Sequence, residues 1–252
     1  MARKQGSKWA KPKEFFGGQE RPWQDDRDAD VASRSRPKFR RAEKPLTAKH
    51  LAYQQAIRTH QIILAVSPAG TGKTSLACAV AVEMLKSGNI DNIVIMRPIL
   101  QCDEDVGTLP GTLQEKMDPF VAPILVIFRE LLGAERVEGM LRDGTLEVTA
   151  LGLIRGRTFH GSFCLVDEAQ NASFGQLKTV MSRLGQGSTL VVSGDVEQTD
   201  FDYPSPLIDV WKLLKKGNCH PGFAFVTMGE EEQLRPEIVN YVTRRLARNP
   251  RA

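Results

Sequence analysis

A short glycine-containing segment, residues 67–74, carries the side chains best suited to hold phosphate groups. Its two glycines, Gly70 and Gly72, permit backbone conformations that leave successive N–H groups pointing into one hollow. Lys73 is long enough to reach the β- and γ-phosphates of a nucleotide, and Thr74 supplies a hydroxyl for Mg²⁺. An apolar run precedes the segment and a helical pattern follows it, as a phosphate-binding loop requires. The loop reads Ser67, Pro68, Ala69, Gly70, Thr71, Gly72, Lys73 and Thr74.

The loop departs from the usual G-x-x-x-x-G-K-[ST] pattern at its first position, where Ser67 replaces glycine. A small side chain fits there only if the strand exit avoids the left-handed region of φ. The alternative is an accidental glycine-rich turn. The strand before the loop and the helix after it favour the phosphate-binding interpretation.

A pair of carboxylates, Asp167 and Glu168, follows the apolar run 163–166. Parallel strands present their carboxyl ends to the same crevice, so this pair is expected beside the phosphate loop. Asp167 would complete the magnesium shell through a water, and Glu168 would polarise the attacking water. Alone such a pair is often a plain strand end. After a phosphate loop it predicts hydrolysis.

A third polar strand end, residues 193–198, includes Gln198. Its amide is placed to sense the γ-phosphate by bonding the attacking water or a phosphate oxygen. The segment is equally compatible with a polar turn of no catalytic role, and both interpretations stay open.

Phosphoryl transfer also needs a cation near the γ-phosphate, often an arginine from another domain or subunit. Arg157 is the first candidate because it lies in a glycine-containing turn before the Asp167 strand. Arg97, at the end of another strand, would face the nucleotide directly, and Arg235 precedes the last helix. For each of them a surface ion pair or a phosphate contact to nucleic acid is the alternative.

The elements that position these residues alternate between strand and helix, which predicts an α/β fold with a mostly parallel sheet covered on both faces. Apolar β-branched runs predict strands, and apolar residues at i, i+3, i+4 and i+7 predict helices. Ser173 and Gln176 have capping-box spacing, and Pro206 lies near a helix start. The predicted strands are 62–66, 92–96, 146–150, 163–166, 189–193 and 223–226, with helices over 75–85, 177–184 and 207–214.

Two segments fit the alternation less simply. Residues 99–145 are interpreted as an insertion over one end of the sheet, with a loop at 107–111 and a mostly helical stretch broken by Pro119 and Pro123. After Pro236 a closing helix is expected. Its inward face would comprise Ile238, Val239, Val242 and Leu246.

Composition excludes several classes. The chain has 252 residues, enough for one large domain or two small ones, and 41% are apolar. No apolar run approaches the ~20 residues that span a bilayer, and the first residues lack a secretory pattern, so a cytoplasmic location without membrane contact is expected. The four cysteines are far apart, which favours neither a zinc site nor a disulfide framework.

Residues 1–45 differ from the remaining domain, 46–252, in charge. They hold thirteen Lys and Arg against seven Asp and Glu, a net charge of +6, and show no apolar period. This pattern predicts a disordered basic tail. Its cations would neutralise nucleic-acid phosphates, and its interleaved aromatics would stack on bases. A solvated tail that aids solubility or docks a protein is the alternative. The aromatics are Trp9, Phe15, Phe16, Trp23 and Phe39.

The ordered set of motifs resembles the PhoH-like ATPase family over about residues 46–245. The phosphate loop and the Arg97-Pro98 pair match that family. So do the Leu-Pro-Gly block that begins at Leu109, the Arg-Gly-Arg-Thr block at 155–158, Asp167-Glu168-Ala169-Gln170-Asn171, and Gly194-Asp195-Val196-Glu197-Gln198. Generic P-loop proteins lack the Leu-Pro-Gly and Arg-Gly-Arg-Thr blocks.

The resemblance implies a single RecA-like core related to superfamily 1 helicases, which binds and hydrolyses ATP with Mg²⁺. It further implies a single-stranded nucleic-acid partner, RNA being favoured, with helicase or remodelling activity, and a homo-oligomeric ring that is expected to be a hexamer. Some family members carry an N-terminal nuclease domain, which is not expected here. His50 stands where family members often carry a Gln, three residues before Tyr53. Such a Gln would read the adenine edge.

Two other functions share parts of this pattern. A P-loop small-molecule kinase would have the same loop, but no acceptor-binding segment is evident. A nucleotide-gated module that binds RNA or protein with little turnover would also have it. Glu168 argues against that module, because a pure switch needs no base.

Overall fold

The computed structural model describes residues 45–98 and 113–247, all within one structural unit, Glu43–Ala252. Residues 1–44 of the predicted tail and the predicted loop at 107–111 lie outside the described residues.

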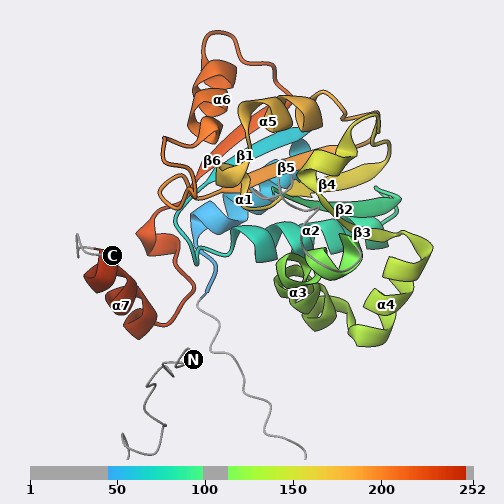
Figure 1. Ribbon diagram of the computed structural model, residues 1–252, viewed down its shortest axis with the longest axis horizontal. Coiled ribbons are helices and arrows are strands. Elements are labelled where there is room, and N and C mark those ends of the chain that lie inside the picture. Colours follow the sequence, from blue (N-terminus) through green and yellow to red (C-terminus); the bar gives the residue numbers. More distant parts are fainter. Residues whose placement is uncertain (1–44, 99–112, 248–252) are drawn as a thin grey trace, which may run out of the picture. The chain divides into compact units, whose positions relative to one another are not determined.

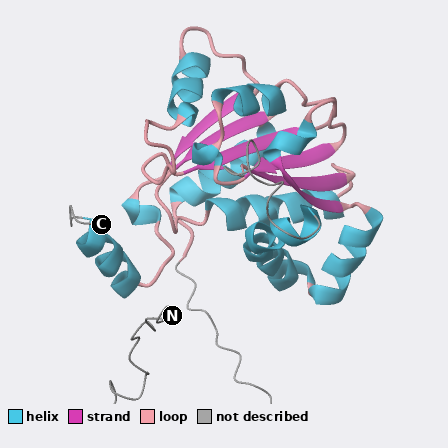
Figure 2. Cartoon of the chain, viewed as in Figure 1, coloured by secondary structure: helices cyan, strands magenta, loops and turns pink. Residues whose placement is uncertain are grey.

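The described residues form a six-stranded, wholly parallel sheet, whose strands are magenta in Figure 2. The strand order is β3-β2-β4-β5-β1-β6, and the strands are labelled in Figure 1. Every strand predicted from the apolar runs is present, so the α/β prediction with a parallel sheet is confirmed. The order places β1, which leads into the phosphate loop, between β5 and β6. The strands are β1 (Ile62–Val66), β2 (Asn92–Arg97), β3 (Leu146–Ala150), β4 (Ser162–Val166), β5 (Thr189–Gly194) and β6 (Phe223–Thr227).

Helices cover both faces of the sheet (Figure 1). Because successive strand residues point to opposite faces, Ile63 packs with one layer of helices and Leu64 with the other. The first layer comprises α1 (Ala48–Thr59), α2 (Lys73–Lys86), α3 (Leu113–Leu132) and α4 (Ala134–Asp143). The second comprises α5 (Phe174–Met181) and α6 (Pro206–Lys215), with the short 3-10 turn η3 (Leu151–Ile154). These two cores hold the strand ends in place.

Helix starts follow the predicted local signals. Ser173 caps α5 and accepts from the backbone N–H of Gln176, whose side chain accepts from the Ser173 N–H in return. Pro206 begins α6, with the Ser205 hydroxyl accepting from Leu207. The capping-box and helix-start predictions are therefore confirmed.

The helix α3 corrects one expectation: it runs unbroken through Pro119 and Pro123. Each proline removes a backbone hydrogen bond. Tertiary packing offsets that loss, because Ile124 and Phe128 are buried in the core shared with α2. The helix contacts α2 and the edge strand β3. None of the helices in the described residues, α3 included, combines the length and the apolar character that crossing a bilayer requires.

Truncating Phe128 should therefore destabilise the whole domain. The ring is fully buried where α3 meets the sheet. We expect Phe128→Ala to lower the free energy of unfolding by about 3–5 kcal/mol, the usual cost of removing a core aromatic. Denaturant unfolding measures it, with Val126→Ala on the exposed side of α3 as the matched control. Equal effects of the two substitutions would mean that α3 does not contribute to the core.

The closing helix α7 (Glu237–Ala247) corrects a second expectation. The predicted inward residues Ile238, Val239 and Val242 are 67%, 39% and 45% exposed. The side chain of Leu246 lies outside the described residues. Periodicity identifies which residues share a helix face, but it does not identify what covers that face. The prediction of a face turned toward the core is thus wrong for these three residues.

Candidate nucleotide-binding site

A cavity of about 230 Å³ lies at the carboxyl ends of β1, β4 and β5. It brings together most of the residues singled out by the sequence, from segments far apart in the chain. Four further residues that sequence reasoning did not assign also line it: Ser75, Ser193, Gly194 and Asp195. The predicted residues at the cavity are Ala69, Gly70, Gly72, Lys73, Thr74, Asp167, Glu168, Gln198 and Arg235.

The loop owes its shape to two left-handed glycines. Gly70 and Gly72 have φ of +83° and +81°, and Gly72 is the N-cap of α2. Ser67 does not have a positive φ, since Glu168 is the one non-glycine residue with positive φ among the described residues. The buried Ser67 hydroxyl lies 2.7 Å from Thr71 Oγ1, which itself donates to the Pro68 carbonyl. Serine is thus accommodated at the first loop position and adds a hydrogen bond inside the loop.

Lys73 opens α2 and folds back over the loop. Its Nζ donates to the carbonyl oxygens of Ser67 and Pro68. Burial lowers the pKa of Lys73, while the nearby carboxylates of Asp195, Glu168 and Asp167 act in the opposite direction. The first turn of α2 adds the positive end of the helix dipole at the same place. A cationic side chain and backbone N–H groups at a helix start are suited to polyphosphate.

Thr74 and Asp167 supply oxygen ligands of the kind that Mg²⁺ takes. Thr74 Oγ1 donates to Asp167 Oδ1 at 2.6 Å, and Asp167 is nearly buried. No group of three His, Cys, Asp or Glu side chains in the described ranges is arranged to hold a metal alone. Mg²⁺ commonly uses one or two protein oxygens and completes its shell with water and phosphate. The hydroxyl–carboxylate pair fits that mode.

Arg97 orients Asp167 and does not line the cavity. Its guanidinium donates to Asp167 Oδ2 through Nε at 3.0 Å and a terminal nitrogen at 2.6 Å. The same terminal nitrogen is 3.7 Å from a carboxylate oxygen of Glu168. Of the alternatives that the sequence left open for Arg97, among them contact with the nucleotide and an ion pair, the structure shows ion pairs with Asp167 and Glu168.

Glu168 has a strained backbone, with φ of +55°, and its side chain is half exposed at the cavity. Gln170 holds it: Nε2 donates to Glu168 Oε2 at 2.7 Å, and Oε1 accepts from the backbone N–H of Asp195 at 3.0 Å. This buried amide links the ends of β4 and β5. Gln170 belongs to the motif at 167–171, but nothing in its spacing indicates this role.

Asp195 joins the end of β5 to the phosphate loop. Its Oδ2 accepts from the backbone N–H of Ala69 at 2.8 Å, and its Oδ1 accepts from Glu197 at 3.1 Å. The neighbouring Ser193 Oγ is fully buried at the cavity wall and has no hydrogen-bond partner among the described residues. The position of both residues at a strand end was the available sequence signal.

The remaining two arginines lie in different places. The Arg235 side chain crosses Gly70 so closely that a β-carbon there would meet its Cδ and Nε at 2.7 Å. Arg157 instead makes two hydrogen bonds to Glu147 of β3 and lies 5.0 Å from the ring centre of Phe159. Arg157 does not line the cavity of its own chain.

Comparison with known proteins supplies the family. Residues 43–247 match the family described as PhoH-like protein. The chain belongs to the PhoH-like protein family. A PhoH-like protein of Synechocystis sp. is 36% identical over 208 residues, covering 81% of this chain and 63% of the relative. Protein PhoH of Escherichia coli is 39% identical over 161 residues, covering 62% of this chain and 46% of that relative. This PhoH-like chain thus matches about half to two thirds of the length of its curated relatives.

A solved structure shows the same fold at low identity. The large terminase of a thermophilic bacteriophage, solved in complex with ADP, gives a TM-score of 0.51 with 12% identity. The match covers 82% of this PhoH-like chain and 51% of the terminase. At this identity the similarity concerns the fold alone, that of a P-loop nucleoside triphosphatase.

His50 of this PhoH-like protein lies in the interior. Its Nδ1 accepts from the Thr47 N–H at 3.0 Å, and its Nε2 is 3.1 Å from the carbonyl oxygens of both Thr71 and Glu232. The ring is fully buried and does not line the cavity. Both ring nitrogens are engaged within the protein, and one of them contacts the carbonyl of Thr71 in the phosphate loop.

Proposed function

We propose that this PhoH-like protein binds ATP with Mg²⁺ and hydrolyses it, in a cycle coupled to single-stranded nucleic acid. The observation that carries the proposal is the meeting of Lys73, Thr74, Asp167 and Glu168 around one cavity. Lys73 and Thr74 come from the start of α2, Asp167 and Glu168 from the end of β4, and each has the chemistry that its role requires.

The proposed division of roles follows from these positions. Lys73 and the N–H groups of the loop bind the β- and γ-phosphates, and the Thr74 hydroxyl and Asp167 carboxylate hold the metal. When bound, Mg²⁺ neutralises charge that develops on the phosphate oxygens. Glu168 orients the attacking water and accepts its proton, while Gln170 holds the Glu168 carboxylate toward the cavity.

Of the three candidate arginines, Arg235 is the one that lines the cavity, so this chain can itself place it beside the phosphates. Arg157 would act only from a neighbouring subunit. A homo-oligomeric ring of six subunits is proposed on the family resemblance.

RNA is the proposed nucleic-acid partner. Support comes from the sequence of residues 1–45, whose net charge of +6 and interleaved aromatics suit phosphate neutralisation and base stacking. Family membership is compatible with helicase or remodelling activity, which is the finer part of the proposal.

Steady-state ATP hydrolysis by the full chain, with and without single-stranded RNA, tests the proposal. We expect Mg²⁺-dependent turnover that RNA increases severalfold. The control, an equal volume of buffer with the same salt concentration and no RNA, should change the turnover less. Single-stranded DNA of the same sequence separates RNA preference from charge. Turnover unaffected by either strand would remove the nucleic-acid part. Binding of ATP without turnover would favour a nucleotide-gated binding module.

A further inference from the structure

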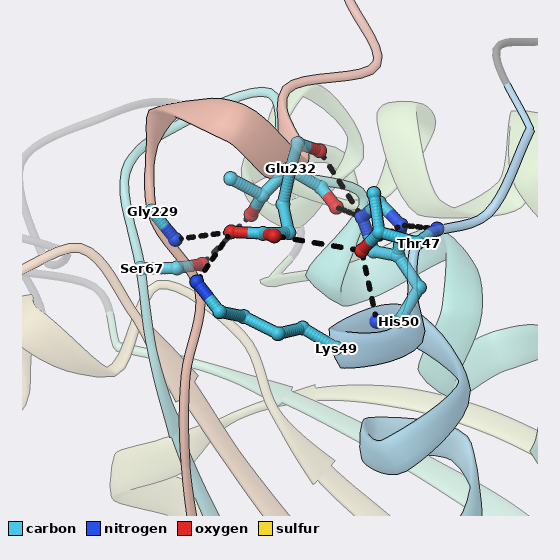
Figure 3. Close-up of polar contacts among 7 residues, drawn as sticks. Thr47, Lys49, His50, Ser67, Gly229 and Glu232 are labelled. Carbon is cyan, nitrogen blue, oxygen red and sulfur yellow. Dashed lines mark hydrogen bonds and ion pairs between the residues drawn. The ribbon is translucent and has the colours of Figure 1, made fainter.

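A buried glutamate outside the cavity is the starting point. Of three successive glutamates, Glu230 and Glu231 are exposed, whereas Glu232 is 3% exposed. Its carboxylate accepts from the backbone N–H of Gly229 at 2.7 Å and from Lys49 Nζ at 3.2 Å (Figure 3). These bonds, that of Gly229 first, lower the pKa of Glu232. A buried carboxylate held in its charged form fixes the groups around it.

Glu232 and His50 together join three segments. The Thr47 hydroxyl, at the start of α1, is 3.5 Å from Glu232 Oε1. The Thr47 N–H donates to His50 Nδ1, so Nε2 carries the ring proton. That proton is shared between the carbonyl oxygens of Thr71 in the phosphate loop and of Glu232. One polar cluster therefore connects α1, the loop and the 3-10 turn η5 (Glu230–Glu232).

The segment that contains Glu232, residues 228–235, lies directly on the phosphate loop, and we name it the strap. Its two ends are bonded to the loop region: Met228 donates to the Val66 carbonyl at 3.3 Å, and Leu234 donates to the Gly70 carbonyl at 2.9 Å. A β-carbon on Gly72 would meet Leu234 Cδ1 at 2.7 Å. Because Gly70 and Gly72 have no side chain, the side chains of Arg235 and Leu234 in the strap can lie against the loop.

We propose that Glu232 is a positioning residue that fixes the strap on the phosphate loop and thereby places Arg235 at the nucleotide. The inference rests on the proposed function. It adds that the loop and the strap respond to nucleotide as one unit.

Hydrogen exchange with a slowly hydrolysed ATP analogue and Mg²⁺ tests the coupling without turnover. In the wild type, the analogue should slow exchange in both the loop, 67–74, and the strap, 228–235. In Glu232→Gln the loop should still be protected, while the strap exchanges as in the free protein. Glu231→Gln, the same chemical change at the exposed neighbour, should behave as the wild type. Lys49→Met removes the ammonium group that bonds Glu232, so it should also reduce the protection of the strap by the analogue.

Kinetics supply a readout that general destabilisation does not give. We expect Glu232→Gln to lower kcat about tenfold with KM for ATP nearly unchanged, and Arg235→Ala to do the same. Because Glu232 acts through Arg235, the double substitution should fall within about twofold of Arg235→Ala alone. If the loss of kcat in the double variant equalled the product of the losses in the two single variants, the positioning role would be overturned.

The outcomes separate the two proposals. Absence of protection at the loop in the wild type would refute nucleotide binding, and the strap inference with it. Protection of the loop with a normally protected strap in Glu232→Gln would refute the inference alone. Thermal unfolding of each variant establishes that the protein measured is folded.

Discussion

Glu168→Gln should lower kcat for ATP hydrolysis by about 10²–10⁴-fold, the usual contribution of a positioned general base. The amide keeps the size of the side chain and can still bond Gln170, so the cavity keeps its shape. It cannot accept a proton from the attacking water. Binding of ATP should stay nearly unchanged, since the proposed phosphate contacts come from Lys73 and the loop, which this substitution leaves in place. Phosphate release and nucleotide titration on the same preparation measure the two quantities.

Glu197→Gln is the matched control for that experiment. It makes the same chemical change at the neighbouring strand end, on a side chain that is exposed and does not line the cavity. Its kcat should equal that of the wild type. A Glu168→Gln protein that hydrolyses ATP at more than a tenth of the wild-type rate would show that another group acts as the base.

The second large effect is expected for Lys73→Ala, which should weaken ATP binding about 10–100-fold and reduce hydrolysis to background. Charge-assisted hydrogen bonds contribute about 1.5–3 kcal/mol each. The ammonium group of Lys73 lines the cavity in which we propose that the phosphates bind. Isothermal titration with the ATP analogue measures the affinity. Lys86→Ala, at the exposed far end of the same helix, should leave both quantities unchanged.

Alkaline pH provides an independent check on Lys73. Burial lowers the pKa of this amine, so it loses its proton at a lower pH than an ordinary lysine does. Affinity for ATP should accordingly fall as pH rises through that pKa, and the Lys73→Ala protein should lack this step. An alkaline loss of affinity that persists in Lys73→Ala would assign it to another group.

Local patterns predicted much of this molecule. The strand, loop and helix around Lys73 are adjacent in sequence, and their hydrophobic periods and glycines are local signals. Asp167 was expected beside Thr74 because carboxyl ends of parallel strands meet, and the two side chains are hydrogen bonded. Such expectations succeed when one rule of sheet geometry brings the residues together.

Contacts between remote segments were not predictable in this way. Gln170 bonds Asp195, and Glu232 bonds Lys49, across separations that carry no period or spacing. The path of α3 through its prolines depends on the packing of Phe128, which no local signal reveals. The exposed face of α7 depends equally on which elements lie beside it.

The serine at the start of the phosphate loop has a thermodynamic consequence for ligand binding. A serine has fewer backbone conformations than a glycine in the unfolded chain, a difference of about 0.4–1 kcal/mol in favour of folding where the native φ allows it. Ser67 meets that condition, and its hydroxyl is bonded within the loop. Together with the bond from Thr71 to the Pro68 carbonyl and that from Leu234 to the Gly70 carbonyl, this bond holds the loop in place once the protein has folded. Nucleotide binding should carry a correspondingly small penalty of conformational entropy, since the loop that receives the phosphates is already ordered.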